Sequence, residues 1–563
     1  MDPMGSTFTG HNSTPMNRHV AFICASLLSF LAMGQVAMVK QGQQFERTGK
    51  NLFGDQHNVV DGVLSGDGSA LVYVQDLQVP KVVRIGADLS PADELSLKDI
   101  PFDGATWTGV GPVIVGGTMH CLLVSPGKKD AAFAIASVND RGAPVLNGMR
   151  RIATSPLPYV NEPTNALIYR PQPDPILLNQ GLHFAQNERL IASPDGSHFL
   201  LSNHSFNAKG NKQFWFACLD KDFKELWSGT KELPFADAAS RIHQISLTDD
   251  GTIHLLSYFF RCPSEEQMRD KLCHEIHFST LSERGTTILD LLIEKDFVST
   301  ARFCERDSGR VTMALRYGAL TGVPGMVLTF DPNAPKLKPT PLVDQRAPSI
   351  RRTKLMAYGS IEPGARKTST SRTAKVPDEI VSIHPGWDGG VVVVETFLDD
   401  AFEVPMDGAI AMRRLAGDIR VSLVGANDSI QWQTIVERAF MTTSGRSYEG
   451  VGITMDGEGI ALLYDHTPKG LDAILASGMS ATPTEGKSKK DKLAAPTEAG
   501  VLKRTVIGKD GTISQQGTAV MLPNGMIPCP FAVLSNDTRI LVRSHDGNNG
   551  HQYTLVDPAR IGE

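Results

Sequence analysis

The sequence repeats a short unit in which an Asp-Gly turn, or a close variant, precedes a run of strand-forming apolar residues. Asp-Gly favours tight turns, and β-branched and aliphatic runs favour strands. The repeat therefore predicts an array of small antiparallel sheets. Its copies are Asp67-Gly68 before Ala70 to Val74, Asp195-Gly196 before Phe199 to Leu201, Asp250-Gly251 before Ile253 to Leu256, Asp388-Gly389 before Val391 to Val394, and the degenerate stretches Asp456 to Leu463 and Asn536 to Val542.

Each copy is followed by a second strand pattern and often by another polar turn, which gives about eight units along the 563 residues. Their spacing of about 50 to 80 residues exceeds the usual propeller repeat, so we assign the extra length to loops. A single unit cannot bury its apolar faces, whereas sheets packed around an axis can. We therefore expect an all-β fold, a β-propeller of seven or eight blades with long inter-strand loops. Two propellers in tandem and a sandwich assembly are the alternatives.

The last unit stops at Tyr553 to Val556, short of a full blade, and we expect an N-terminal strand within Val59 to Leu64 to close the ring. Irregular insertions are expected near 156–175, 336–375 and 477–498. The interval 336–375 carries ten Lys or Arg residues against two acidic ones. It is either a solvated linker or a contact with an anionic surface. In the second case the contact residues are Arg351, Arg352, Lys354, Arg366 and Lys367.

The first 40 residues carry the pattern of a secretory signal peptide. Arg18 precedes an apolar run from Val20 to Met33, and Ala32 and Gly34 supply the small residues that a signal peptidase reads. A single N-terminal anchor helix is the alternative, because the apolar run is borderline in length. We expect a periplasmic or extracellular protein with no membrane span after cleavage. The predicted division is a signal peptide at 1–34, with Met1 or Met16 as its start, and a propeller at 35–563.

Composition excludes some classes of protein and leaves others open. Hydrophobic residues make up 41% and charged residues 21% of the chain, an ordinary globular balance. The net charge of -6 gives no general attraction to nucleic acid. Six cysteines remain after cleavage, too few for disulfides to hold so long a chain together. Cys262 and Cys273 flank one polar loop and are the disulfide candidate, whereas Cys121 and Cys218 lie in strand patterns and are expected in the core.

Aligning the repeats places polar residues at equivalent strand ends. Those with ligand chemistry are Asp76, His204, His466 and His545, our ligand-binding candidates. Equivalent positions of propeller blades reach one rim, and imidazoles and carboxylates bind transition metals. Against a shared metal, equivalent atoms on separate blades lie far apart, and histidine at a strand end also caps turns. We therefore assign no metal, no cofactor and no catalytic residue.

Ser193-Pro194-Asp195-Gly196 with its following strand resembles TolB-like and WD-repeat-like propellers. Asp222 to Trp227 followed by Asp250 to Leu256, and Asp428 to Trp432 followed by Leu462 to His466, are similar to a group of uncharacterised secreted proteins of Bacteroidetes. The resemblance implies a propeller in a bacterial envelope or secreted protein. It implies no reaction.

The sequence contains no Gly-x-Ser-x-Gly elbow, no His-Glu-x-x-His pair, no Walker loop and no Asp-x-Asp-x-Asp-Gly calcium loop. We therefore expect a non-catalytic binding or scaffold protein with a protein or glycan partner at the bacterial envelope. Two alternatives stay open: a subunit of an envelope assembly, and a metal-dependent hydrolase or lyase with its site in the propeller channel. Fold alone does not decide among them.

Overall fold

The structure is a computed structural model of the chain. It describes residues 38–46, 59–75, 79–139, 142–159, 190–205, 210–236, 240–260, 274–291, 298–306, 309–317, 325–332, 334–342, 350–353, 371–374, 379–403, 411–438, 440–442, 450–466, 500–522, 526–536, 538–545 and 550–561. The expected signal peptide, Asp76 and both cysteines of the disulfide candidate lie outside these residues. So do Lys354, Arg366 and Lys367.

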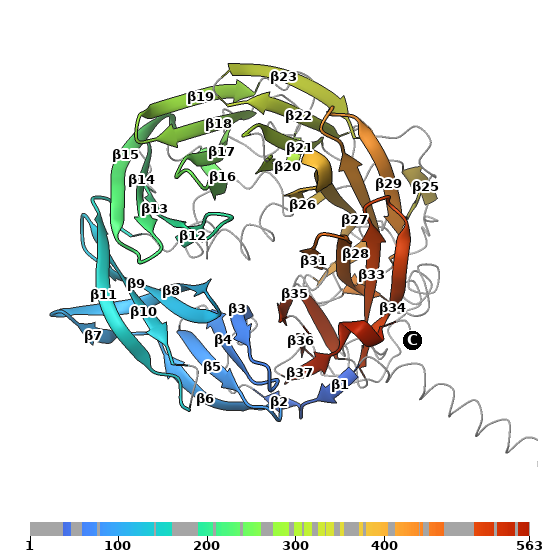
Figure 1. Ribbon diagram of the computed structural model, residues 1–563, viewed down its shortest axis with the longest axis horizontal. Helices are drawn as coiled ribbons and strands as arrows, with labels where there is room; N and C mark the ends of the chain where they lie inside the picture. The colour runs from blue at the N-terminus through green and yellow to red at the C-terminus, as the bar shows by residue number, and fades with distance from the viewer. Residues whose placement is uncertain are drawn as a thin grey trace, which may run out of the picture.

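Eight antiparallel sheets of four or five strands stand around one axis as the blades of a β-propeller (Figure 1). The expected fold class is confirmed, with eight blades. The strands of each blade are given from the innermost outward. Blade 1 contains β3 (Val59–Leu64), β4 (Ala70–Gln75), β5 (Pro80–Ile85) and β6 (Pro91–Ser96), and blade 2 contains β8 (Ala105–Val115), β9 (Thr118–Pro126), β10 (Ala131–Val138) and β11 (Leu146–Ser155). Blade 3 contains β12 (Leu190–Ala192), β13 (His198–His204), β14 (Asn211–Asp220) and β15 (Glu225–Ala236), and blade 4 contains β16 (Ser240–Leu247), β17 (Ile253–Phe260), β18 (His274–Ser282) and β19 (Gly285–Leu291).

The second half of the ring repeats this plan. Blade 5 contains β20 (Val298–Glu305), β21 (Val311–Tyr317), β22 (Met326–Asp331) and β23 (Ala334–Pro341), and blade 6 contains β26 (Glu379–Pro385), β27 (Val391–Glu403), β28 (Ala411–Val424) and β29 (Ile430–Val436). Blade 7 contains β31 (Val451–Met455), β32 (Gly459–His466), β33 (Gly500–Gly508) and β34 (Ile513–Leu522), and blade 8 contains β35 (Ile527–Ser535), β36 (Ile540–His545) and β37 (Gly550–Val556). Short strands add to this plan: β7 (Ile100–Phe102) pairs with β8, β30 (Phe440–Thr442) pairs with β28, and β24 (Ile350–Thr353) and β25 (Ser371–Ala374) form a separate hairpin.

The ring closes through a strand that sequence reasoning did not select. β1 (Met38–Gln41) is the outermost strand of blade 8 and pairs with β37, with Lys40 opposite Leu555. β2 (Phe45–Glu46) pairs further along the same strand. The prediction that Val59 to Leu64 closes the ring was wrong, because that segment pairs with β4 as the innermost strand of blade 1. Closure joins both ends of the described chain in one sheet, which protects the outer edge of β37.

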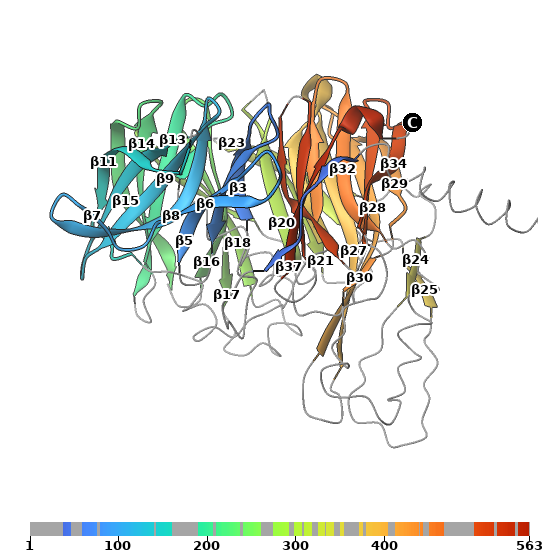
Figure 2. The same cartoon turned by 90° about the horizontal axis from the view of Figure 1, so that it is seen from below.

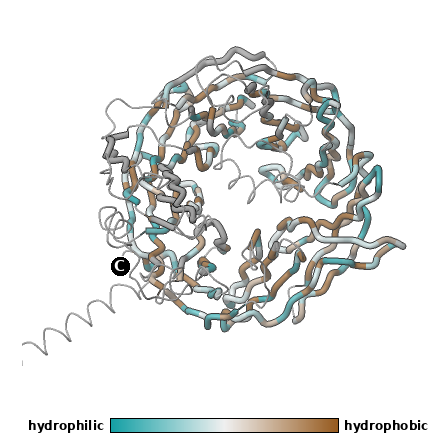
Figure 3. Tube along the Cα trace, turned by 180° about the vertical axis from the view of Figure 1, so that it is seen from behind, coloured by the Kyte–Doolittle hydropathy of each residue, from teal (hydrophilic) through white to brown (hydrophobic). Residues whose placement is uncertain are grey.

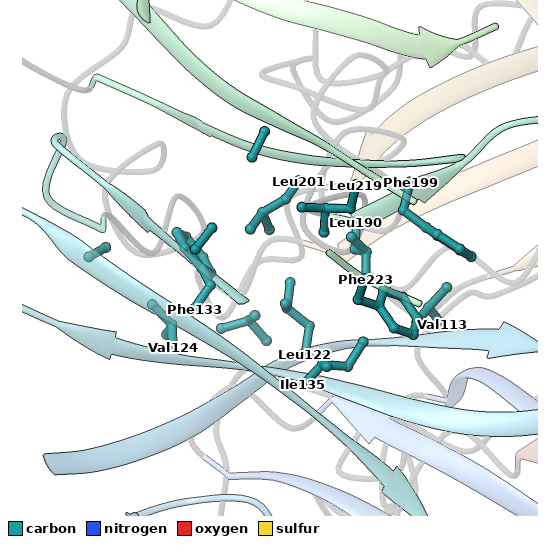
Figure 4. Packing of buried hydrophobic residues seen from close by; sticks show 14 of the residues in the cluster. Val113, Leu122, Val124, Phe133, Ile135, Leu190, Phe199, Leu201, Leu219 and Phe223 are labelled. Carbon is teal, nitrogen blue, oxygen red and sulfur yellow. The ribbon is translucent and has the colours of Figure 1, made fainter. Parts of the chain in front are cut away.

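The hydrophobic core is divided into eight clusters, one at each joint between consecutive blades. Figure 4 shows the joint between blades 2 and 3, where Phe133 of β10 faces Leu201 and Leu219 of blade 3. Phe133 also stacks on Trp215 with ring centroids 5.9 Å apart. Each fully buried large side chain contributes roughly 1.5–3 kcal/mol. Figure 3 shows that hydrophobic residues recur along the described strands around the ring.

Cys121 and Cys218 are buried, as expected from their strand patterns. Trp432 contacts the turn of the next blade: its indole Nε1 donates to Lys509 O at 2.7 Å, and its ring lies beside Gly511. In the described part of the chain, no helix is long and apolar enough to cross a membrane.

The antiparallel order gives the propeller two chemically different faces, seen edge-on in Figure 2. On one face of the propeller, connections join the first strand of each blade to the second and the third strand to the fourth; we call this face the turn face. The loop face holds the connections from second to third strand and from one blade to the next. The intervals 156–189, 261–273, 343–378 and 467–499 all connect strand ends of the loop face. The three insertions expected from sequence lie mostly outside the described residues, and the interval 336–375 begins inside β23.

On the turn face the repeated Asp-Gly motif forms the same hydrogen bonds in blade after blade. The Oδ1 atom of the turn Asp or Asn accepts the backbone N–H two residues later, as for Asp67 with Ser69 (2.9 Å) and Asp510 with Thr512 (3.0 Å). The glycine has a left-handed backbone, with φ of 89° at Gly68 and 81° at Gly511. Glycine adopts that conformation without steric cost. Sequence and local geometry therefore agree on this face.

Candidate functional site

The candidate histidines all lie where the repeat alignment predicted, at the loop-face ends of second strands. His204 ends β13, His466 ends β32 and His545 ends β36. His204 and His466 are not brought together, because blades 3 and 7 are four blades apart in a ring of eight. Metal–nitrogen bonds are only about 2 Å long, so His204 and His466 cannot share one metal. Among the described residues, no group of three or more His, Cys, Asp or Glu side chains is placed to hold a metal ion.

A buried charge cluster lies at the loop-face end of the joint between blades 5 and 6. We call Arg316, Glu395 and Arg420 the Glu395 cluster. Arg316 of β21 donates through Nε to Glu395 Oε1 at 2.7 Å and through Nη2 to the same oxygen. Arg420 of β28 donates through Nε to Glu395 Oε2 at 2.7 Å and through Nη2 to Leu342 O at 2.9 Å. The exposed fraction of each side chain is 1% or less.

The Glu395 cluster is sealed from solvent, so it serves as a joint rather than as a binding surface. One carboxylate between two guanidinium groups compensates charges whose burial would otherwise be strongly unfavourable. β27 and β28 continue beyond Thr396 as a paired arm, with Leu398 opposite Ala416 and Glu403 opposite Ala411. Figure 2 shows this arm and the β24–β25 hairpin extending from the loop face.

The β24–β25 hairpin places part of the expected basic contact on this face. Arg351 and Arg352 lie on β24, opposite Thr373 and Arg372 of β25. The remaining members of that predicted contact lie outside the described residues. Of the five predicted contact residues, the structure therefore places only the backbone of Arg351 and Arg352.

A second polar cluster lies at the loop-face end of the joint between blades 6 and 7. We call Asp418, Arg438, Asp465, His466 and Lys503 the Arg438 cluster. Arg438 is 2% exposed; its guanidinium donates to Asp465 O and Gly450 O at 3.3 Å each, and its backbone N–H donates to Asp418 Oδ1 at 2.9 Å. These bonds hold the guanidinium over the end of β32.

His466 and Lys503 lie on neighbouring strands of blade 7, because Tyr464 pairs with Lys503 and His466 pairs with Val501. They are therefore diagonal neighbours on one sheet face, within reach of long side chains. Both are half-buried. Burial, together with the charges of Lys503 and Arg438, lowers the pKa of His466 to about 4, so its imidazole is neutral at pH 7. Burial also lowers the pKa of Lys503, which Glu437 partly offsets.

Sequence reasoning found His466 but missed the residues around it. Glu395, Arg316 and Asp465 share a signal that was available: each is a charged residue that directly follows an apolar strand run. Arg438 and Lys503 have a weaker signal, because only two apolar residues precede Glu437-Arg438 and Lys503-Arg504. Only the fold shows which residues surround them. The site is a product of strand pairing between residues that lie far apart in the chain.

No protein-family model matches this sequence, and no curated protein matches it. Among solved structures, the apo form of prolyl oligopeptidase B from Galerina marginata is similar at 8% identity and a TM-score of 0.38, over 87% of this chain and 56% of that chain. An ulvan lyase of a new polysaccharide lyase family is similar at 11% identity and a TM-score of 0.33, over 80% of this chain and 94% of that chain.

An endo-arabinase from Bacteroides thetaiotaomicron is similar at 12% identity and a TM-score of 0.26, over 53% of this chain and 99% of that chain. This chain spans a little over half the length of prolyl oligopeptidase B. At these scores the likeness carries no argument about activity or ligand. The functional argument therefore rests on the residues of this chain.

Proposed function

We propose that this protein is a secreted or envelope β-propeller that holds a protein or glycan partner on its loop face and catalyses no reaction on it. The observation that carries the proposal is the difference between the faces. The turn face is closed by short, repeated turns, whereas the loop face carries the arm, the β24–β25 hairpin and the half-buried polar groups of the Arg438 cluster. Binding residues concentrate on connections that a rigid scaffold positions.

The proposed location rests on the N-terminal sequence. The basic start, apolar run and small residues before Gln35 fit a secretory signal peptide, and the resemblance to secreted Bacteroidetes proteins agrees with it. The closing strand β1 begins at Met38, so cleavage after Gly34 would leave it intact. Mass spectrometry of the protein recovered from a periplasmic fraction tests the proposal. A new N-terminus near Gln35 supports it, and an intact N-terminus in the cytosolic fraction contradicts it.

Partner binding is tested by retention on bacterial envelope fractions. We would compare the mature chain, residues 35–563, with a variant in which a short Gly-Asn-Gly turn replaces residues 399–415 of the arm. The matched control is Asp222→Lys on the turn face, where Asp222 is exposed. All three proteins should melt alike. We expect retention to fall in the arm variant alone. Equal retention in all three would contradict the proposal, and release of a modified glycan would favour the hydrolase or lyase alternative.

A further inference from the structure

The Arg438 cluster combines three nitrogen-bearing side chains at one strand end. The side chain of Arg438 reaches it from the connection between blades 6 and 7, and His466 and Lys503 reach it from β32 and β33. The three act on one another's charges, because both Arg438 and Lys503 contribute to the lowered pKa of His466. Three separate segments thus converge on a patch that is half-buried at His466 and Lys503.

The carboxylates near this patch are arranged so that they leave Lys503 available. Asp465 is fully buried beneath Arg438, and Asp418 accepts the backbone N–H of Arg438. Burial raises the pKa of Asp418, and its hydrogen bond from the Arg438 backbone partly offsets that rise. The exposed Glu437 is the carboxylate whose charge acts on Lys503. Within the described part of the chain, no hydrogen bond or ion pair engages the Nζ atom of Lys503.

We propose that Lys503, His466 and Arg438 form a subsite for the carboxylate of an acidic sugar, a uronic acid unit of a glycan. The inference rests on the proposed function and names the ligand chemistry of that same face. Lys503 supplies the charge for a carboxylate, with Arg438 fixed behind it. The imidazole, neutral at pH 7, carries one donor and one acceptor. A neutral polar ring beside the ammonium group suits the hydroxyl groups which flank the carboxylate of a sugar acid, and which an acidic peptide lacks.

The test is calorimetric titration of the full mature chain with a hyaluronate tetrasaccharide at low ionic strength. Maltotetraose serves as the neutral sugar and tri-glutamate as the acidic peptide. Lys503→Gln removes the proposed contact. Lys509→Gln is the matched control, because it makes the same charge change in the same blade but on the exposed turn face. Melting temperatures confirm that both variants are folded.

We expect the wild type and Lys509→Gln to bind the uronate sugar alike and Lys503→Gln to bind it about ten-fold more weakly, the effect of one lost charge-assisted hydrogen bond. Maltotetraose should not bind. Unchanged affinity in Lys503→Gln, or no binding by the wild type, overturns the subsite. Equal affinity for tri-glutamate overturns its preference for sugar acids. Arm-dependent retention on envelope fractions without uronate binding would leave the proposed function standing and remove only this subsite.

Discussion

The turn face and the loop face are the two ends of the same eight sheets, yet different interactions hold them in place. On the turn face a side-chain oxygen binds a backbone N–H two residues away, and the arrangement recurs around the ring, as at Asp67, Asp220 and Asp510. On the loop face, buried charges meet across joints between blades, and each arrangement occurs once in the described residues. Local interactions tolerate the loss of one copy, whereas a buried charge left alone is strongly unfavourable.

In the described residues, the turn face has an inter-blade charge cluster of its own. The buried Arg306 lies 3.0 Å from Asp428, and the more exposed Arg310 lies 3.3 Å from it, so both join blade 5 to blade 6. The joint between these blades therefore has a buried charge pair near each end. Single substitutions test this difference between the two faces.

The largest effect is expected from Glu395→Gln in the Glu395 cluster. Glutamine keeps the shape but removes the negative charge between two buried guanidinium groups. We expect a loss of about 3–5 kcal/mol in the free energy of unfolding. Urea denaturation at pH 7 measures it. The control is Glu94→Gln. The half-exposed side chain of Glu94 lies 3.5 Å from Lys81, and its substitution should change stability by about 0.5 kcal/mol or less. Similar values for the two variants would contradict the comparison.

A smaller loss is expected where a turn of one blade touches the next blade. In Gly511→Ala a Cβ would lie 2.6 Å from the ring of Trp432, at a residue with φ of 81°. We expect a loss of about 1–3 kcal/mol from backbone strain and the shifted indole. Gly457→Ala is the matched change, because a Cβ there meets nothing within 4 Å. Equal midpoints in urea would show that the Trp432 contact is unimportant.

A substitution in the Asp250 turn should lower the free energy of unfolding by less again. Asp250→Ala removes the acceptor for the backbone N–H of Thr252, at 3.1 Å, and should lower the free energy of unfolding by about 1 kcal/mol. Asp250→Asn keeps a side-chain oxygen and should retain most of the stability, since Asn427 and Asn536 form the same turn elsewhere. Thermal unfolding of both variants at pH 7 separates them. A loss as large as that of Glu395→Gln would refute the contrast between the faces.

The remaining prediction concerns the sign of a pH dependence rather than the size of a loss. On the turn face, burial and the charges of Asp250 and Asp249 raise the pKa of Glu305 to about 7, from 4.5. Between those values the unfolded chain has already lost the proton that the folded chain keeps. Glu305 therefore makes stability fall as pH rises from about 4.5 to 7. Glu305→Gln should remove that slope.

His466 on the loop face should have the opposite sign. Its folded pKa is about 4 and its unfolded value 6.5, so between them the unfolded chain binds the extra proton. Stability should rise with pH over that window, and His466→Gln should remove the rise. Urea midpoints of the wild type and both variants at pH 4.5, 5.5 and 6.5 give the two differences. Differences of the same sign would show that the burial of one of these groups is wrongly assigned.

Much of the fold followed from the sequence, but the closing strand did not. The Asp-Gly turns and the runs after them predicted the second strand of blade after blade, because turn chemistry and strand propensity act over a few neighbouring residues. β1 has no such motif: Met38 to Gln41 is a short polar and apolar mixture. It was missed because the open edge of β37 selects it, and that edge exists only once the ring has formed.

The residues of the Arg438 cluster likewise fall into two groups: one that the sequence indicated and others that only the structure revealed. The repeat alignment placed His466 at the end of its strand, since equivalent positions follow from period and register. Lys503 and Arg438 could not be found that way, because pairing of β32 with β33 and the path from blade 6 to blade 7 bring them to His466. Likewise Arg316 and Glu395 lie 79 residues apart and meet only across a joint between blades.

By itself, then, the sequence determined the all-β class, the repeated unit, the turn face and the strand ends that carry histidine. These depend on interactions between near neighbours in the chain. The tertiary structure decided the number of blades, the strand that closes the ring, the gathering of long connections on one face and the partners of each buried charge. These depend on which strand edges and which sheet faces meet, and therefore on contacts between distant segments.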